Sequence, residues 1–229
     1  IFVVNVDDDT PGFTITPISG PTSEDGGTAT FTFKVNTVPD DLDSSTNNDN
    51  VTINISSSDT TEGTVYPSQL VFTKSNWNSE NQITVTGVDD NLSDGNQSYS
   101  IILDLDNSTT AVGYSIFNPS DVNLYNIDSD SSGFYVSAVS NDTDESTATA
   151  TFTVRLASQP TADVTIGVTS SDTGEGTVSA STLTFSSSNW SAEQTVTVTG
   201  VSDNLSDGDQ SYAILLTDNT TTDTRYQYV

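Results

Sequence analysis

Short stretches in which apolar residues alternate with polar or small ones recur along the whole chain. Four of them are TATFTFKV (28–35), VTINIS (51–56), NQITVTGV (81–88) and YSIILDL (99–105). Alternation with a period of two is typical of strands that bury one face. In the first two stretches that face would carry Phe31, Phe33, Val35, Val51, Ile53 and Ile55. Turn residues separate the stretches, and about seven such strands in about 110 residues predict an all-β fold made of antiparallel β-sandwiches.

The second half of the chain repeats the first. Ser57–Tyr99 aligns without a gap with Ser170–Tyr212, 113 residues later, and 29 of the 43 aligned positions are identical. Upstream the offset is 121 residues, because the first copy has a surface loop within Pro39–Asn50 that is eight residues longer. Units of this size predict tandem globular domains and not a solenoid of short repeats.

The repeat also predicts the domain limits. Residues 10–130 would form the first domain, and residues 131–229 the second, which lacks the last strand of the first. Residues 1–9, IFVVNVDDD, align with DVNLYNIDSD at 121–130 and would be the final strand and linker of a preceding or neighbouring domain. A sandwich without its edge strand exposes backbone groups and an apolar slot, so residues 1–9 could complete a neighbouring unit in a head-to-tail homopolymer. The alternatives are one period of a longer tandem array and an arbitrary boundary of the sequence.

Charge narrows the range of partners. Acidic residues outnumber basic ones 32 to 4, for a formal net charge of −28. Four scattered cations cannot form a basic patch, so nucleic acids and anionic membranes are unsuitable partners. The chain has no Cys and no His, which excludes disulfides, thiolate chemistry and the usual zinc ligands. No apolar run is long enough for membrane insertion, and the acidic, Ser/Thr/Asn-rich composition favours an extracellular or cell-surface bacterial protein.

The acidic residues gather in islands at strand ends or in loops, at equivalent places in both copies. In the first copy the islands are Glu24; Asp59 with Glu62; Asp89 and Asp90 with Asp94; and Asp128 with Asp130. In the second they are Glu145; Asp172 with Glu175; and Asp203 with Asp207 and Asp209. Loops at one end of a sandwich meet in space, and carboxylates that meet raise one another's pKa or need a cation. Six to eight oxygen ligands in flexible loops suit Ca²⁺ better than Mg²⁺; the alternative is surface acid that serves solvation alone.

Together these features resemble the Calx-beta family, calcium-binding β-sandwich modules of sodium–calcium exchangers and of large bacterial surface proteins and adhesins. The resemblance spans both repeats and depends on SSDTTEGT (57–64), ITVTGVDDNLSDGNQSY (83–99) and the closing VDDD (6–9). In the first domain it implies calcium ligands at Glu24, Asp59, Asp89, Asp90, Asp94, Asp128 and Asp130, with the carbonyl of Leu92. In the second it implies Glu145, Asp172, Asp203 and Asp207, with the carbonyl of Leu205. Ser202 and Ser129 stand where the family has acids, which implies fewer or weaker ions, and we expect Asp7, Asp8 and Asp9 to close the second site from a neighbouring unit.

The function that we expect from the sequence is structural. The chain would be a calcium-binding repeat of an extracellular filament or adhesin stalk, in which Ca²⁺ at domain junctions rigidifies a head-to-tail array. The second hypothesis is an adhesive module that binds cell-surface glycans through Trp77 and Trp190, each in an SNW motif, although packing at the core or sheet edge is the simpler role for both. No enzyme is expected, because the same acids repeat in both copies without a nucleophile motif or an aromatic cleft.

Overall fold

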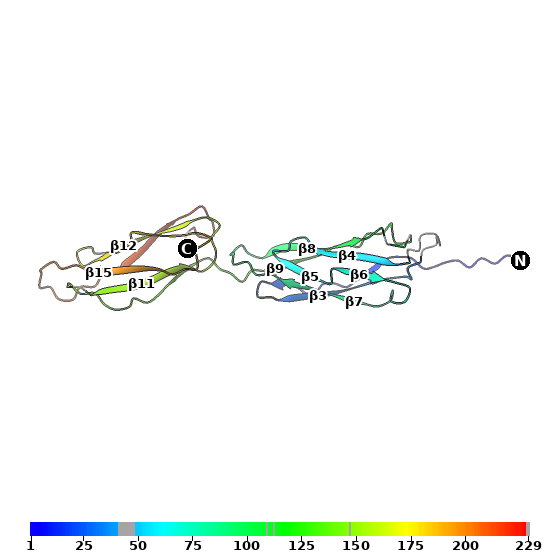
Figure 1. The fold of residues 1–229 in the computed structure, drawn as a ribbon, viewed down its shortest axis with the longest axis horizontal. Coiled ribbons are helices and arrows are strands. Elements are labelled where there is room, and N and C mark those ends of the chain that lie inside the picture. The colour runs from blue at the N-terminus through cyan, green and yellow to red at the C-terminus, as the bar shows by residue number, and fades with distance from the viewer. Residues whose placement is uncertain (41–48, 109, 112, 147, 228–229) are drawn as a thin grey trace. The chain divides into compact units, whose positions relative to one another are not determined.

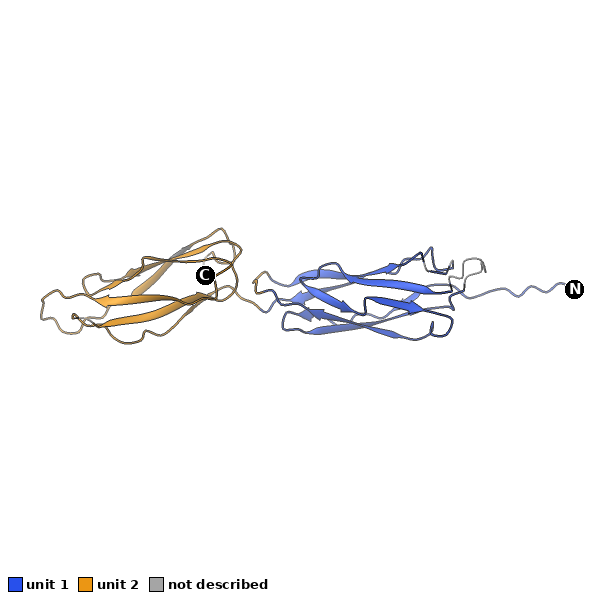
Figure 2. Ribbon diagram, in the orientation of Figure 1, with its two compact units in different colours: residues 1–90, 95–129 blue, residues 91–94, 130–229 orange. Residues whose placement is uncertain are grey.

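The chain folds into two compact units. The computed structural model describes residues 1–40, 49–108, 110–111, 113–146 and 148–227. Unit 1 comprises residues 1–90 and 95–129, and unit 2 comprises residues 91–94 and 130–229 (Figure 2). In each unit two layers of strands face one another (Figure 1). The described residues contain no helix that is long and apolar enough to cross a membrane. The predicted all-β sandwich fold is confirmed.

Unit 1 consists of a four-stranded and a five-stranded sheet. The first has the order β1-β3-β7-β5 and contains β1 (Phe13–Ile15), β3 (Thr28–Val35), β7 (Asn81–Gly87) and β5 (Gly63–Tyr66). The second has the order β2-β9-β8-β4-β6 and contains β2 (Thr22–Ser23), β9 (Val122–Ile127), β8 (Gln97–Leu105), β4 (Val51–Ser57) and β6 (Gln69–Phe72). Neighbouring strands are antiparallel, except that β2 and β9 run parallel.

The core of unit 1 follows the alternation in the sequence. In β3 every second side chain from Ala29 to Val35 is buried. The six side chains predicted to face the core are all buried: Phe31, Phe33, Val35, Val51, Ile53 and Ile55. Phe33 contacts the opposite sheet, since its ring centroid lies 5.7 Å from that of Phe72 on β6. It also lies 5.4 Å from the ring centroid of Phe13 on the neighbouring strand β1. The period of two in the sequence therefore identifies the inner face of this sandwich.

Unit 2 repeats this topology with fewer strands. Its first sheet has the order β10-β11-β15-β13 and contains β10 (Phe134–Val136), β11 (Thr149–Leu156), β15 (Gln194–Gly200) and β13 (Gly176–Val178). Its second has the order β14-β12-β16 and contains β14 (Thr182–Phe185), β12 (Val164–Ser170) and β16 (Ile214–Thr220). Among the described residues, this sheet has no counterpart of β2 or β9.

The two tryptophans and the long loop have distinct surroundings. Trp77 and Trp190 are partly buried against the cores of their own units, which confirms the predicted packing role. Of the loop predicted within Pro39–Asn50, residues 41–48 lie outside the described part of the chain. Asp40 and Asp49, on either side of residues 41–48, both form an ion pair with Lys74. Lys74 Nζ lies 3.0 Å from Asp40 Oδ1 and 3.1 Å from Asp49 Oδ2.

A buried carboxylate organises the last described turn of unit 2. Asp223 is 3% exposed and accepts hydrogen bonds from the Thr161 N–H at 2.7 Å and from Arg225 Nε at 3.0 Å. Burial alone would raise the pKa of Asp223, but the Arg225 guanidinium and the N–H groups of Thr161 and Arg225 hold it well below its ordinary value of 3.8. The ionised form of this side chain therefore stabilises the folded unit.

We expect Asp223→Asn to destabilise unit 2 by about 2–3 kcal/mol at pH 7, because Arg225 loses its charged partner. A lowered folded-state pKa gives stability that is present above the unfolded value of 3.8 and is lost as the pH falls through the folded value. The difference between wild type and variant should therefore shrink in thermal melts recorded from pH 7 down to about pH 2. Asp163→Asn, at an exposed position of the same unit, is the matched control; a difference that stays constant with pH would contradict the assignment.

Candidate metal sites

The parallel pair β2–β9 brings two predicted ligands together. Glu24 directly follows β2 and Asp128 directly follows β9, and the Glu24 N–H donates to the Ile127 carbonyl at 3.1 Å. The Ser129 N–H donates to Glu24 Oε2 at 2.7 Å, and the Glu24 residue is only 5% exposed. Glu24, Asp128 and Asp130 each offer an oxygen atom, and the three atoms lie within 4.8 Å of one another. A carboxylate is thus buried beside two others.

The NLSDG sequence after β7 and after β15 forms the same tight loop in both repeats. Asn91 and Asn204 have φ values of 68° and 64°, and Gly95 and Gly208 both have a φ of 77°. These left-handed conformations are accessible to Gly and, more than to most residues, to Asn, which explains why the motif needs both residue types. The Gly95 N–H donates to Asp128 Oδ2 at 2.6 Å, which attaches the first loop to the end of β9.

A second carboxylate group forms around the first NLSDG loop. It consists of Glu62, Asp90 and Asp94, again with one oxygen from each residue within 4.8 Å of the others. Glu62 lies directly before β5 and is 8% exposed, whereas Asp94 is exposed. The residue before β5 and the loop after β7 therefore contribute to one cluster of oxygen atoms.

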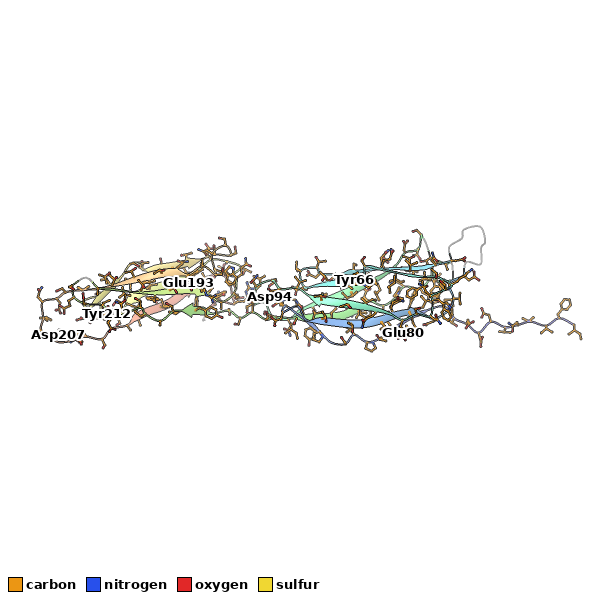
Figure 3. The ribbon with its side chains drawn as sticks, turned by 60° about the horizontal axis from the view of Figure 1, so that its bottom comes forward. Tyr66, Glu80, Asp94, Glu193, Asp207 and Tyr212 are labelled. Atoms are coloured by element: carbon orange, nitrogen blue, oxygen red, sulfur yellow. The ribbon has the colours of Figure 1, made fainter. Side chains whose placement is uncertain are left out.

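A third group forms around the second NLSDG loop, in unit 2, and is more open. Glu145, Asp203 and Asp207 are all exposed, and their closest oxygen atoms lie within 4.8 Å of one another. Figure 3 shows Asp207 in the loop at one end of this unit. The Asp203 carboxylate accepts a hydrogen bond from the Leu205 N–H at 2.8 Å, and the Ser202 hydroxyl makes a long contact of 3.5 Å with Glu145 Oε2. Ser202, which stands where the first repeat has Asp89, thus contacts the group.

The pKa of Glu175 is affected by the negative charge at this end of unit 2. Partial desolvation raises its pKa above the ordinary value, and repulsion from neighbouring carboxylates raises it further. Those neighbours, in decreasing order of effect, are Asp207, Asp203, Asp172 and Glu145. The charges of several carboxylates therefore act together on Glu175.

Three of the predicted acids lie outside these groups. Asp59 accepts hydrogen bonds from the N–H and hydroxyl of Thr61 at 3.0 and 2.5 Å, and these bonds lower the pKa of Asp59. Asp172 accepts the Gly174 N–H at 2.9 Å in the equivalent turn. The third acid is Asp89. The first two carboxylates thus stabilise the turns that contain them, and a ligand role for all three stays a prediction.

The remaining predicted ligands are Leu92, Leu205, Asp7, Asp8 and Asp9. Leu205 is 64% exposed, and a ligand role for the two leucine carbonyls stays a prediction. Asp7, Asp8 and Asp9 are exposed and form a fourth group of their own, with oxygen atoms within 4.8 Å of one another. These three acids lie in a segment that contains no strand.

Sequence reasoning placed Glu62 and Glu175 in acidic islands but did not select them as ligands. In the structure the Glu62 carboxylate lies with those of Asp90 and Asp94. The charges of Asp203 and Asp207 contribute to the raised pKa of Glu175. A signal for both was present, since each is followed by Gly-Thr at the start of an equivalent strand in the two repeats.

No model of a known protein family matches the chain, and no curated protein matches its sequence. Solved structures with a similar fold include the calcium binding domain CBD12 of CALX1.1, which aligns over 87% of this chain and 77% of that one, with 12% identity and a TM-score of 0.36. Domains 5–6 of the S-layer protein SbsC align over 93% of this chain and 97% of that one, with 15% identity and a TM-score of 0.28. A protein of unknown function from Porphyromonas gingivalis W83 aligns over 83% of this chain and 83% of that one, with 9% identity and a TM-score of 0.33. Membership of the Calx-beta family therefore remains a prediction.

Proposed function

We propose that this chain is a calcium-binding structural repeat of an extracellular filament, surface layer or adhesin stalk. The observation that carries the proposal is the convergence of carboxylates from separate loops within 4.8 Å, which occurs around the NLSDG loop of each repeat. Acid that served solvation alone would have no reason to converge, or to bury Glu24 to 5% exposure. Convergence of this kind favours a bound cation.

The donor atoms fit calcium. All are carboxylate oxygens, and the chain contains no His and no Cys that would favour a transition metal. Ca²⁺ accepts six to eight oxygens with flexible geometry, so waters and backbone carbonyls could complete each set. The residues that would hold it are Glu24, Asp128 and Asp130, then Glu62, Asp90 and Asp94, and in unit 2 Glu145, Asp203 and Asp207.

Calcium would act here as a structural cross-link. Glu24 and Asp128 follow neighbouring strands, and an ion between them would add to the few hydrogen bonds of the two-residue strand β2. Binding to the folded state alone stabilises it by mass action. The same acids in successive repeats suit a spacer better than an active site, and the packing of Trp77 and Trp190 against the cores leaves the glycan-binding alternative with less support.

Titration calorimetry with calcium tests the proposal. The wild-type chain should bind with dissociation constants of about 10⁻⁴–10⁻³ M, as extracellular modules do. The double variant Glu145→Gln/Asp207→Asn should lose the binding that belongs to unit 2. The double variant Asp163→Asn/Glu193→Gln removes two charges from exposed positions of the same unit and should bind as the wild type does; Figure 3 shows Glu193 distant from Asp207. Equal calcium binding by both variants would refute the site.

A further inference from the structure

Unit 2 has an open sheet edge where unit 1 has a strand. In unit 1, β8 lies between β4 and β9. In unit 2 the equivalent strand, β16, pairs with β12 alone among the described residues. Residues 210–213 and 143–144, whose equivalents in unit 1 pair with β9, form no strand. The part of the sandwich that β9 organises in unit 1 is therefore the part that lacks pairing in unit 2.

The open edge exposes core side chains. In unit 1 three inward side chains of β8 are at most 4% exposed: Tyr99, Ile101 and Leu103. Their equivalents in unit 2, each 113 residues later, are only partly buried: Tyr212, Ile214 and Leu216. These three side chains line a groove of about 890 Å³ between the two sheets of unit 2. The groove has the place, and part of the lining, of the slot that β9 fills in unit 1.

Residues 1–9 have the sequence that this groove requires. They align with β9 and the residues after it at an offset of 121, so that Val3 corresponds to Leu124 and Asn5 to Asn126. Leu124 and Asn126 are the two buried side chains of β9. Residues 1–6 are exposed along their whole length, and Val3 is 88% exposed. An apolar segment of this length in water is suited to adding a strand to a sheet edge.

A buried polar contact makes the match specific. Asn126 is 1% exposed; its amide donates to the Val88 carbonyl at 2.9 Å, and its Oδ1 accepts from the Thr22 hydroxyl at 2.9 Å. Unit 2 retains both partners as Val201 and Thr143. Thr143 also bonds the Tyr212 hydroxyl, at 2.6 Å, as Thr22 bonds Tyr99 at 2.8 Å.

A glycine keeps room for that asparagine. A Cβ atom on Gly87 would lie 2.2 Å from the Ser23 carbonyl oxygen and 2.5 Å from Asn126 Oδ1. The equivalent residue in unit 2 is Gly200, where a Cβ atom would lie 2.1 Å from the Asp144 carbonyl oxygen. Unit 2 thus keeps the equivalents of the valine, the threonine and the glycine that surround Asn126 in unit 1. Asn5 is the residue of the N-terminal segment that aligns with Asn126.

We propose that residues 1–6 of a second copy of this chain insert beside β16 and complete the sandwich of unit 2. By the register of β8 and β9, Val3 would lie opposite Tyr212 and Asn5 opposite Gln210. Asp7 would then follow the inserted strand next to Glu145, as Asp128 follows β9 next to Glu24. Because the donor segment and the acceptor groove are different surfaces, repeated insertion produces an open head-to-tail polymer. Insertion would depend on the contacts of Val3 and Asn5 and would not require calcium, although it would place Asp7 within the proposed calcium site.

Charge opposes this association, so the conditions of the test matter. Two chains with a net charge of −28 each repel one another at low ionic strength. At 0.15 M salt the screening length is about 8 Å, and short-range strand contacts can outweigh the repulsion. Experiments therefore use at least this ionic strength, with calcium and with EDTA in parallel.

Sedimentation velocity of the full chain over a range of concentrations tests the proposal. We expect dimers and longer species that dissociate on dilution, and at least about tenfold weaker association for Val3→Asp, because its charge would enter the groove. Val4→Asp is the matched control, since the equivalent Tyr125 is 42% exposed and faces outward. Residues 1–6 lie outside the core clusters, so neither variant should impair folding. A monomer at every concentration, or association that Val3→Asp leaves unchanged, would overturn the proposal.

Cross-linking tests the register, because the chain has no cysteine of its own. A Val4→Cys chain mixed with a Ser211→Cys chain should give a covalent heterodimer with a short thiol-specific cross-linker, since Tyr125 pairs with Ser98 in unit 1. Thr182→Cys, exposed on β14 at the other edge of the same sheet, should react far less. Equal yields with the two acceptors would overturn the register. If the chain bound no calcium but strand insertion still occurred, the proposed function would be refuted and this inference would stand.

Discussion

Removal of calcium is expected to lower the melting temperatures of both units by on the order of 10 °C. If each ion binds with a dissociation constant of about 10⁻⁴–10⁻³ M, 10 mM calcium adds about 1.4–2.7 kcal/mol per ion to the folded state. A change of 1 kcal/mol shifts the melting temperature of a domain of this size by about 4–8 °C. Scanning calorimetry in 10 mM calcium and in EDTA measures the shift. The effect is large because the total stability of such a domain is itself only about 5–15 kcal/mol.

Two controls make this result specific. Magnesium at the same concentration should restore much less of the melting temperature, since it demands stricter octahedral geometry than clusters of loops provide. The Glu145→Gln/Asp207→Asn variant should lose the calcium dependence of unit 2 and keep that of unit 1. Small-angle scattering should also show larger, more variable dimensions in EDTA if ions restrain successive units. Melting temperatures and dimensions that EDTA leaves unchanged would contradict a structural role for calcium.

Gly87→Ala is expected to destabilise unit 1 by about 3 kcal/mol and to weaken its calcium binding. A Cβ atom on residue 87 would lie 2.2 Å from the Ser23 carbonyl oxygen, which belongs to the backbone and cannot rotate away. Overpacking of this kind typically costs about 1–3 kcal/mol. Any displacement of Ser23 also moves Glu24, the buried carboxylate of the first group. Chemical denaturation and calcium titration of the same variant measure the two effects.

Gly20→Ala is the matched control for this substitution, because no atom lies within 4 Å of a Cβ built on residue 20. It should leave both stability and calcium affinity close to the wild-type values. The melting of unit 2 provides a second reference within the same molecule. Similar losses of stability in both alanine variants would show that the steric contact with Ser23 is not the cause.

Local chemistry explains which features the sequence could predict. Alternation identified Phe31, Phe33 and Ile53 as core residues, because a strand places successive side chains on opposite faces whatever its neighbours are. The loop motif NLSDG predicted equivalent turns, and the φ values of Asn91 and Asn204 agree to within a few degrees. These properties depend on residues adjacent in sequence.

The choice among neighbouring acids depends on contacts that no local pattern contains. Asp59 and Glu62 are three residues apart, yet Asp59 bonds Thr61 in its own turn while Glu62 is buried in the cluster with Asp90 and Asp94. Which side chain enters the cluster depends on where β5 begins and on its register with β7. The parallel pairing of β2 with β9, which brings Glu24 to Asp128, likewise joins segments about 100 residues apart.

The sequence by itself determined the all-β class, the two repeats, the inward faces of the strands and the acidic loops, because each of these is written in spacings of a few residues or in a direct repeat. Only the tertiary structure decided which carboxylates share a site, and that the groove beside β16 is lined by partly exposed Tyr212, Ile214 and Leu216. The physical reason is that these features arise where distant strands pair, and strand register is set by the packing of the whole sandwich.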